Sequence, residues 1–365
     1  MSRKFFPVFA LLIVLSMVLA ACAAPVAEEV AVAVEEAGET EGAAPAEGGS
    51  TLATVKERGY VICGGNANVP GFGFIDTEGN YSGFDIDFCK AVAAAVFGDA
   101  EKYEIRPLSS QERFTALQSG EIDTLIRNTT WTLSRDTDLG ANFTATTFYD
   151  GQGFIVRIAD GITALEDLDG GTVCVQTGTT TEANLADVMA ARGISYEPIV
   201  YEDVETGWTT YEEGRCDAYT TDKSGLVSRR TLLGNPDDHM IMDETISKEP
   251  LGPVVRHGDD QWFDIVQWTV FATFFAEEHG ITSANADDMM ANTKSPSEKK
   301  FFGTEGELGS FLGLDADWAY NVVSQVGSYS EIYDRNLGPD TKTFIPRGLN
   351  SLYVDGGLLY APAWR

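Results

Sequence analysis

Residues 82–98, "SGFDIDFCKAVAAAVFG", carry the pattern of an amphipathic helix. Apolar side chains recur at positions 84, 88, 92 and 96, acids occupy the first turn, and Gly98 follows the last apolar position. That spacing, with acids first and glycine last, is typical of a helix. The apolar segments "YVICGG" (60–65) and "YEIRPL" (103–108) flank it and indicate two strands. A strand, a helix and a strand in this order predict a parallel pair joined by a helical crossover.

The same alternation continues along the chain. A short helix is expected after the capping box Ser109-x-x-Glu112. Further strands are expected at 122–126, 172–176, 196–201 and 217–222, and further helices at 181–192 and 259–279. This order predicts α/β architecture, with largely parallel sheets and helices on both faces.

The N-terminal 21 residues read as a secretion signal, with two early cations and an apolar run from Phe5 to Val18. Leu19-Ala20-Ala21-Cys22 resembles a bacterial lipobox, in which cleavage leaves Cys22 as a lipidated N-terminus. The alternative is an ordinary signal peptide that contains a cysteine. Residues 22–50 have no aromatic side chain and no Lys or Arg, and they predict a flexible acidic linker.

The remaining residues, about 315, are rich in aromatic side chains and are enough for two lobes. The chain has 25 basic and 56 acidic residues, a formal net charge of −31. This charge argues against nucleic acid or an anionic membrane surface as a partner.

Four cysteines follow the linker: Cys63, Cys89, Cys174 and Cys216. Outside the cytoplasm an even number indicates disulfides, and four cysteines allow three pairings. The local pairing, 63–89 and 174–216, is favoured because it keeps each bridge within one lobe. With three histidines in all and no metal-type spacing, no metal site is expected.

Polar residues gather in the loops that follow the expected strands. In open α/β sheets, ligands bind beyond the carboxyl ends of the strands, where such loops converge. The loops hold a phenylalanine, two arginines, two threonine runs and an aspartate, at 66–72, 127–135, 176–182 and 221–225. A site for a zwitterion needs cations to pair with its carboxylate, an acid to pair with its ammonium and an aromatic ring to pack against its Cα. These loops contain all three.

Several long blocks carry a family resemblance, among them "GFDIDFCKAVAAAVFGD", "RFTALQSGEIDTLIRNTTWTLSRDT", "VCVQTGTTTEANLAD" and "ISKEPLGPVVRHGDDQWFDIV". The chain resembles the amino-acid-binding proteins of bacterial ATP-driven importers, extracytoplasmic solute-binding family 3, and most of all their general L-amino-acid and Glu/Gln/Asp/Asn-binding branch. The resemblance implies a two-lobed, periplasmic-binding-protein-like (type II) fold with two hinge-crossing strands. The crossings are expected near 151–156 and 251–256. Lobe 1 is then 51–150 plus 257–365, and lobe 2 is 151–256.

The resemblance also implies roles for the threonines and for one arginine. Arg135 ends the family's S/T-x-T-x-x-R pattern and would grip the ligand's α-carboxylate, with Thr130 and Thr132 earlier in the same pattern. Arginine suits this role because its planar donors match the two oxygens of a carboxylate. Thr179 and Thr180 open the expected lobe 2 helix, where they would meet the ligand or serve only as helix caps.

Four further residues complete the implied site. Asp222 stands where the family's ammonium-binding acid lies. Phe72 fits the aromatic residue of the first loop, with core packing as the alternative. Arg113 and Ser110 match positions that contact polar ligand side chains, although Arg113 could be an ordinary helix residue paired with a nearby acid.

Two residues of the 127–135 loop have other expected roles. Arg127 is expected to brace this loop, and the sequence leaves open whether Trp131 walls the pocket or packs between helices.

The implied function is capture of a free L-amino acid, with Glu, Gln, Asp or Asn favoured, and its delivery to an ABC permease and ATPase. We expect a monomer outside the cytoplasm, held to the membrane only by its lipid, with no cofactor. A cyclohexadienyl-dehydratase-like enzyme and a sensory ectodomain are the alternatives on the same fold. The site loops contain no second acid–base pair for an enzyme, and no downstream transmembrane helix for a sensor follows. The tail from Gly338 is expected to dock on lobe 1.

Overall fold

Helix α2 (Phe84–Phe97) follows the expected range and lies against a sheet that begins with β1 (Val61–Gly65). In the computed structural model, which describes residues 50–365, β1 pairs in parallel with strands on both sides, β5 (Tyr103–Pro107) and β6 (Thr124–Leu125). Antiparallel strands β15 (Val254–Arg256) and β7 (Ala141–Phe143) complete the order β5-β1-β6-β15-β7. The signal peptide (1–21), Cys22 and the linker up to residue 49 lie outside the described residues.

A second sheet repeats this plan in the order β11-β10-β12-β9-β13. Its strands are β11 (Tyr196–Tyr201), β10 (Gly171–Gln176), β12 (Ala218–Asp222), β9 (Gln152–Arg157) and β13 (His239–Ile241). The first three are parallel, and β9 and β13 are antiparallel to their neighbours. The expectation of largely parallel sheets therefore holds, because four strands of each sheet run in one direction and one strand, β9 in lobe 2 or β15 in lobe 1, runs against them.

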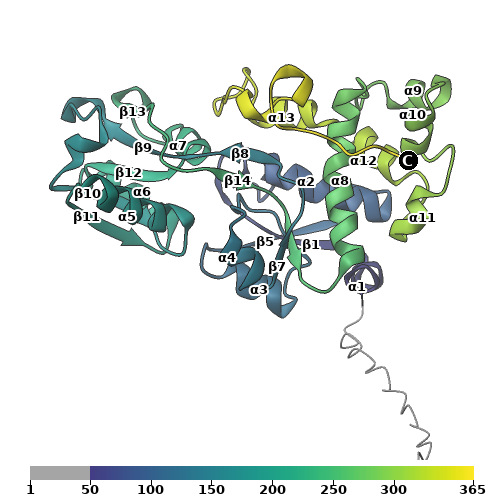
Figure 1. Ribbon diagram of the computed structural model, residues 1–365, viewed down its shortest axis with the longest axis horizontal. Helices are drawn as coiled ribbons and strands as arrows, with labels where there is room; N and C mark the ends of the chain where they lie inside the picture. Colours follow the sequence, from purple (N-terminus) through teal and green to yellow (C-terminus); the bar gives the residue numbers. More distant parts are fainter. Residues whose placement is uncertain (1–49) are drawn as a thin grey trace, which may run out of the picture. The chain divides into compact units, whose positions relative to one another are not determined.

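The two sheets are joined by two segments that pair with each other, β8 (Phe148–Asp150) and β14 (Glu249–Leu251). Figure 1 shows these segments running side by side between the part of the chain built on β1 and the part built on β10. They lie just before the expected crossings, because residues 152–157 and 254–256 already belong to the two sheets. We call the part with β5-β1-β6-β15-β7 lobe 1 and the part with β11-β10-β12-β9-β13 lobe 2.

Apolar side chains alternate along the lobe 2 strands and form a core on each face of the sheet. Phe154 and Val156 of β9 pack with residues of α5 (Thr180–Arg192), whereas Ile155 packs on the opposite face with residues of α6 and α7. Because successive strand residues point to opposite faces, each sheet is covered by helices on both sides. In lobe 1, α2 and α8 (Asp260–Glu278) contribute to one core, and α3 (Arg113–Ser119) contributes to the other. The two-lobed α/β fold that the sequence predicted is confirmed.

The remaining elements are short. Those of lobe 1 before the first crossing are α1 (Thr51–Arg58), β2 (Asn68–Val69), β3 (Gly73–Ile75), β4 (Tyr81–Ser82) and α4 (Leu133–Thr137). Lobe 2 adds η1 (Ile158–Asp160), η2 (Leu165–Leu168), α6 (Val204–Glu212), α7 (Lys223–Arg230) and η3 (Pro236–Asp238). After α8 come α9 (Ala286–Asn292), α10 (Pro296–Phe301), α11 (Leu308–Leu312), α12 (Trp318–Gln325), α13 (Tyr329–Leu337), η4 (Gly348–Asn350) and η5 (Tyr353–Asp355).

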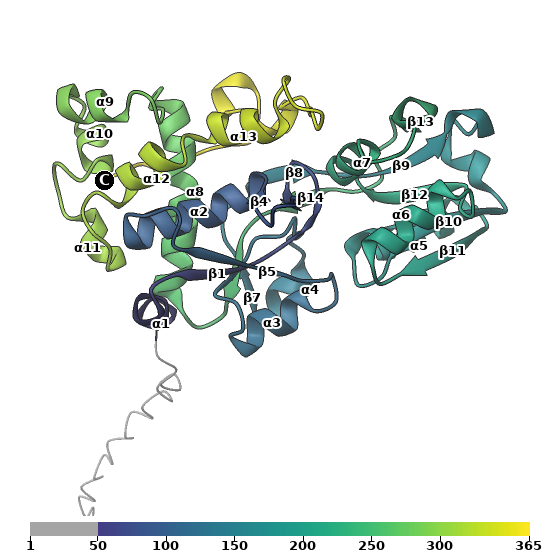
Figure 2. The same cartoon turned by 180° about the vertical axis from the view of Figure 1, so that it is seen from behind.

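The C-terminal segment returns to lobe 1, as Figures 1 and 2 show for the chain end beside α12. Trp364 is 4% exposed, and its ring stacks on Trp318 with the centroids 5.4 Å apart. It also contacts Phe301 and Phe275, which belong to the same core as α2. The tail is therefore part of the lobe 1 core.

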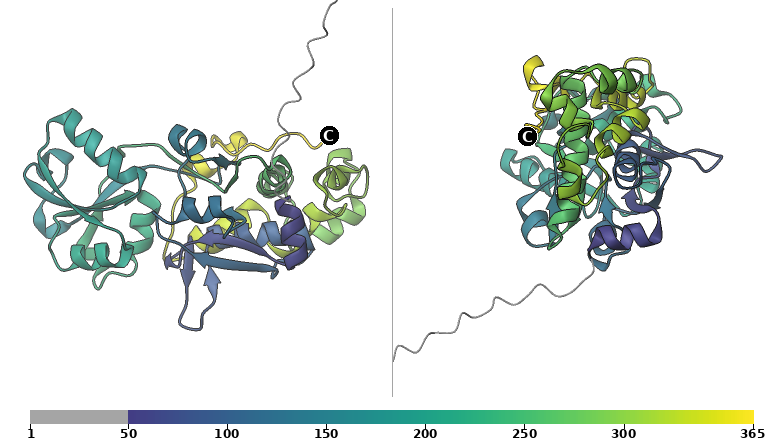
Figure 3. Two further views of the ribbon diagram at one scale, coloured as in Figure 1. Left: turned by 90° about the horizontal axis from the view of Figure 1, so that it is seen from below. Right: turned by 90° about the vertical axis from the view of Figure 1, so that its right-hand side faces the viewer.

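Disulfides join Cys63 to Cys89 and Cys174 to Cys216, the local pairing favoured above. Each bridge lies within one lobe, and Figure 3 shows the two lobes from two further sides. Among residues 50–365, no helix has the length and apolar character that crossing a membrane requires. Within the same range, no cluster of three or more His, Cys, Asp or Glu side chains is arranged to hold a metal ion.

Candidate ligand-binding site

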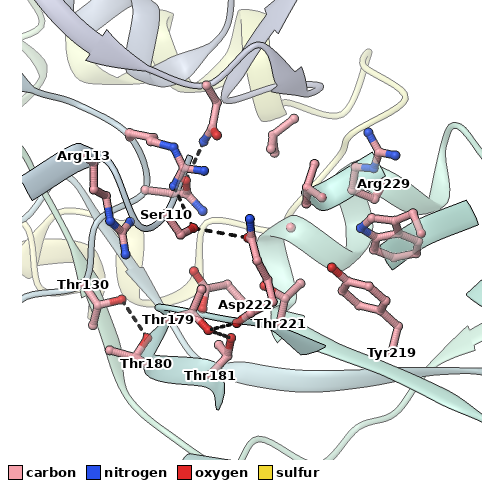
Figure 4. A pocket seen from close by; sticks show the side chains of 18 residues that line it. Ser110, Arg113, Thr130, Thr179, Thr180, Thr181, Tyr219, Thr221, Asp222 and Arg229 are labelled. Atoms are coloured by element: carbon pink, nitrogen blue, oxygen red, sulfur yellow. Dashed lines mark hydrogen bonds between the residues drawn. The ribbon is translucent and has the colours of Figure 1, made fainter. Parts of the chain in front are cut away.

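A cavity lies between the two lobes, where the four post-strand loops meet (Figure 4). Every loop that the sequence analysis singled out contributes to its lining. The cavity volume is about 50 Å³. Because one water molecule needs about 10–15 Å³ on this measure, the space fits a compact solute of several heavy atoms.

Contacts between the lobes enclose the cavity. Ser110 Oγ of lobe 1 donates to Gln176 Oε1 of lobe 2 at 3.2 Å, and the hydroxyls of Thr130 and Thr180 are 3.4 Å apart. A third contact joins Arg229 of lobe 2 to lobe 1, because one of its N–H groups donates to the carbonyl oxygen of Asn68 at 2.8 Å. The lobes thus meet around a cavity lined by residues from both.

Three arginines of lobe 1 lie buried around one side of the cavity. Arg113 and Arg127 line it, and Arg135 lies directly behind Thr130, donating to its carbonyl oxygen at 2.9 Å. Arg127 Nε donates to the Leu108 carbonyl at 2.7 Å. Arg127 therefore braces the loop after β5 and not, as had been expected, its own loop, and it also lines the cavity.

Burial is the main cause that lowers the pKa of each of these guanidinium groups. It lowers the pKa of Arg113 well below its ordinary value, and repulsion from Arg135 and Arg127 adds to the effect. The pKa of Arg127 falls to about 10. Arg113 Nε is buried with no hydrogen-bond acceptor among the described residues. An anion in the cavity would supply the missing acceptor and offset the repulsion.

A second cluster, of buried acids, faces the arginines from lobe 2 and from the crossing strands. It consists of Asp222 at the end of β12, Asp150 on β8 and Glu249 on β14. Asp222 is 5% exposed and Glu249 is 1% exposed, whereas Asp150 is half-buried. Burial raises the pKa of Asp222 well above its usual range, and repulsion from Asp150 and Glu249 raises it further. Burial likewise raises the pKa of Asp150 to about 6. Asp222 Oδ1 lacks a donor within residues 50–365, so a ligand cation would complete this cluster.

The N-terminus of α5 supplies hydroxyl groups to the same cavity. Thr179 is its N-cap, because its hydroxyl accepts from the N–H of Glu182 at 3.1 Å. Thr180 and Thr181 follow in the first turn, and all three threonines line the cavity. Thr180 Oγ1 donates to Glu249 Oε2 at 2.8 Å, which ties the helix end to the second crossing strand.

The loop after β6 is held by its own polar contacts. Asn128 has a φ of 27°, in the left-handed region that asparagine tolerates better than most residues. Its N–H donates to Asp85 at the start of α2. Thr130 forms an isolated bridge with Leu251 of β14, and the Trp131 N–H donates to the Pro250 carbonyl at 2.9 Å. The loop that carries Thr130 is therefore fixed to the same crossing strand as α5.

Six of the nine residues assigned to the ligand line the cavity: Ser110, Arg113, Thr130, Thr179, Thr180 and Asp222. The other three do not. Arg135 lies behind Thr130, and Thr132 is the N-cap of α4, accepting from the Arg135 N–H at 3.3 Å. Phe72 is 1% exposed in a cluster with Phe84 and Phe148, the position that its core-packing alternative describes.

Sequence reasoning missed several residues of the lining. Asn66 directly follows β1, Gln176 ends β10, and both lie in loops that were singled out, so their position alone could have marked them. Trp131 stacks on Phe143 with parallel rings and lies outside the lining. Trp208, Tyr219 and Arg229 belong to α6, β12 and α7 of lobe 2, and no motif distinguished them from core and surface residues.

The family model that describes bacterial extracellular solute-binding proteins, family 3, matches residues 61–275. The chain is 54% identical over 324 residues to the general L-amino acid-binding periplasmic protein AapJ of Rhizobium johnstonii, covering 88% of this chain and 95% of that protein. It is 50% identical over 316 residues to the glutamate/glutamine/aspartate/asparagine-binding protein BztA of Rhodobacter capsulatus, covering 87% and 94%.

A solved structure from Brucella ovis, described as an ABC transporter periplasmic binding protein with glutathione bound, matches with a TM-score of 0.85. It is 48% identical, and the match covers 87% of this chain and all of that one. All three relatives are named as binding proteins, the Brucella ovis one as part of an ABC transporter, and none is named as an enzyme, in agreement with the prediction. This chain belongs to the bacterial extracellular solute-binding proteins of family 3.

Proposed function

We propose that this protein captures a free L-amino acid between its two lobes and delivers it to an ABC importer. The observation that carries the proposal is a pair of opposite, buried charges around one cavity, Arg113 and Asp222, each with an atom that lacks a partner in the described part of the chain. A zwitterion satisfies both. The names of the relatives AapJ and BztA support an amino acid as the ligand.

The carboxylate of the ligand would lie beside the arginines and the N-terminus of α5. Arg113 lines the cavity there, and Arg135 is buried just behind Thr130. Thr180 adds a hydroxyl at the helix end, where N–H groups favour an anion. The ammonium would lie at Asp222, whose Oδ1 has no donor among residues 50–365.

Closure completes the site, because its residues come from both lobes. In the open form a ligand would meet only one set, and the contact between Ser110 and Gln176 would form as the lobes close. Stripping one partner from a buried ion pair costs about 3–5 kcal/mol. Each lobe therefore contributes enough binding free energy that closure should depend on the ligand.

The cellular setting forms part of the proposal. Cleavage before Cys22 would leave a lipidated cysteine, and residues 22–50 would tether a monomeric body outside the cytoplasm. Lobe 1 would comprise residues 51–150 and 257–365 and lobe 2 residues 151–256, with the second boundary moved a few residues earlier because β15 (Val254–Arg256) belongs to the lobe 1 sheet. The closed form would dock on a membrane permease with its ATPase.

Titration calorimetry with the twenty common amino acids tests the site. Arg135→Ala should weaken binding, because Arg135 holds the Thr130 carbonyl behind the cavity and adds positive charge beside the ligand carboxylate. Arg113→Ala should abolish binding, because it removes the cavity-lining cation that would face the ligand carboxylate. Thermal unfolding of each variant controls for folding. Normal affinity in Arg135→Ala would remove that arginine from the site, and normal affinity in a folded Arg113→Ala would overturn the placement of the ligand carboxylate.

A second candidate ligand is glutathione, because the Brucella ovis relative was solved with it bound. Glutathione also presents an ammonium and a carboxylate on one carbon. The enclosed cavity of about 50 Å³ favours a single amino acid, since a tripeptide would hold the lobes further apart. A thermal-shift screen separates the two, because a ligand at a hundred times its dissociation constant stabilises the folded form by about 2.7 kcal/mol.

A further inference from the structure

The cavity has an end that the zwitterion does not use. Figure 4 shows Arg113, Thr130 and Thr180 on one side of the cavity and Arg229 and Tyr219 on the opposite side. Trp208 also lines the cavity and stacks on Tyr219. We call Trp208, Tyr219 and Arg229 the far end.

The far end is a rigid stack of side chains. The rings of Trp208 and Tyr219 lie 4.4 Å apart at an angle of 22°, and the Arg229 guanidinium lies 5.7 Å from the Trp208 ring centre. Tyr211 packs edge-on against the same indole. Stacked aromatic rings with a guanidinium above them hold their polar atoms in fixed positions.

Two N–H donors of this stack are unused. Trp208 Nε1 and Arg229 Nε are buried, and neither meets an acceptor anywhere in residues 50–365. The terminal nitrogens of Arg229 are occupied, by Glu205 and by the Asn68 carbonyl. A buried donor without an acceptor is costly and uncommon, so two at one end of a ligand cavity point to an acceptor on the ligand.

The charge of the far end is already balanced. Glu205 accepts from both terminal nitrogens of Arg229, at 2.5 and 2.8 Å. The donors are therefore offered without a free positive charge, which suits the neutral oxygen of an amide better than a second carboxylate. The Tyr219 hydroxyl both donates and accepts, so it can also receive an amide N–H.

The far end also lies within reach of a ligand side chain. Tyr219 and Asp222 are three residues apart on strand β12, about 10 Å along the strand. A ligand whose ammonium meets Asp222 would have to extend a side chain of several bonds to reach Trp208 and Tyr219. Alanine and serine are too short for this contact, whereas glutamine is long enough.

We infer that the far end is a specificity subsite that reads the terminal amide of a ligand side chain, as in glutamine. Trp208 Nε1 and Arg229 Nε donate to the amide oxygen, Tyr219 pairs with the amide nitrogen, and Glu205 keeps Arg229 neutralised. This inference rests on the proposed function, because it places the ligand by its ammonium and carboxylate.

The first experiment compares glutamine with methionine, which has a similar length but no amide. Calorimetry on the full chain should show that the wild-type protein prefers glutamine. Trp208→Phe keeps an aromatic ring but removes the donor, and it should reduce that preference about tenfold, the effect of one buried hydrogen bond. Trp268→Phe makes the same change on α8 of lobe 1, away from the cavity, and should leave the preference unchanged.

The second experiment tests the charge balance with Glu205→Gln. Glu205 is half-exposed, so this variant should fold normally. With Arg229 no longer neutralised, the protein should shift toward glutamate over glutamine by about threefold, as expected for a partly exposed pair. An unchanged ratio would overturn the role of Glu205.

The outcomes separate the two proposals. If the wild-type protein binds no amino acid, the proposed function fails. If it binds methionine as tightly as glutamine, or if a folded Trp208→Phe keeps its preference, the far-end subsite is wrong while amino-acid capture stands. Glutathione is the third titrant. Binding of glutathione alone would show that the donors serve a peptide, and would overturn the side-chain assignment.

Discussion

The charge of one carboxyl group, that of Asp222, controls how ligand affinity should depend on pH. Burial and the neighbouring acids Asp150 and Glu249 raise its pKa in the empty protein, and Arg113 and Arg135 oppose that rise. A ligand ammonium pairs only with the ionised form. Binding must therefore favour ionisation of Asp222 and release a proton whenever the empty site is protonated.

Affinity should consequently fall as the pH falls. The pKa of Asp222 is raised well above its usual range and that of the interacting Asp150 is raised to about 6, so the change should occur in a pH window above the ordinary range of a carboxyl group. Above this window affinity is full, and below it each pH unit costs up to about tenfold per proton released. Calorimetry from pH 5 to 8, in buffers with different heats of ionisation, measures both the affinity and the proton release.

Asp222→Asn is the matched variant for this titration. This variant should bind the ligand at least about a hundredfold more weakly at neutral pH, because the buried ion pair between Asp222 and the ligand ammonium is lost. Its residual affinity should not vary with pH between 5 and 8. A wild-type affinity that stays constant from pH 5 to 8 would contradict the placement of the ammonium at Asp222.

Single residues show where sequence reasoning stops. Arg113, Thr130 and Asp222 could be placed at the cavity only through the family resemblance, because loop position marked the segments of Thr130 and Asp222 without giving them a role and did not mark Arg113 at all. Phe72 could not be placed, because a cavity wall and a core both use a buried aromatic ring. Arg229 carried no signal, since a basic residue in the last turn of a helix is common on protein surfaces.

The element that joins the two halves of the site is the second crossing strand, β14. Glu249 on this strand accepts from Thr180 and Asn184 of α5, each at 2.8 Å, and from Ser247 at 2.6 Å. Its neighbour Leu251 bridges to Thr130 of lobe 1. Residues 249–251 of β14 therefore position both segments that face the ligand, the N-terminus of α5 and the loop that carries Thr130.

Removing the Glu249 carboxylate should loosen this arrangement. Glu249→Ala leaves the donors of Thr180 and Asn184 unpaired and should weaken ligand binding about tenfold or more, mainly through faster dissociation. Ser247→Ala is the control, because it removes a donor to the same carboxylate without touching α5. Stopped-flow dissociation rates, with thermal unfolding beside them, distinguish positioning of α5 from general destabilisation. Equal rates in both variants would mean that Glu249 has only a structural role.

The elements also differ in how well the sequence foretold them. Helices α2 and α8 were predicted closely, because long apolar repeats end at Gly98 and Gly280. The small sheet β2-β3-β4 was missed, since strands of two or three residues are too short to show alternation. The crossings were placed about three residues late, because the hinge pairing of β8 with β14 depends on tertiary contacts and leaves no local pattern.

At the scale of the whole molecule, both lobes follow one plan, in which four strands of a sheet run in one direction and one strand runs against them. The crossing strands lead into the antiparallel strands of both sheets, β9 in lobe 2 and β15 in lobe 1. Lobe 1 alone carries the C-terminal helices and the tail, which enlarge its core on the face of α2 and α8. The tail should therefore govern stability and leave recognition unaffected.

The tail is anchored by Trp364, and a single substitution there tests this division. Trp364→Ala empties a site lined by Trp318, Phe301 and Phe275, and it should lower the free energy of unfolding by about 3–5 kcal/mol. Tyr360→Ala, at a position 61% exposed, should change it by less than about 0.5 kcal/mol. Urea unfolding measures both values. No tail residue lines the ligand cavity, so calorimetry on folded Trp364→Ala should give the wild-type affinity. A loss of affinity would mean that a change in the packing of the lobe 1 core also changes the ligand site.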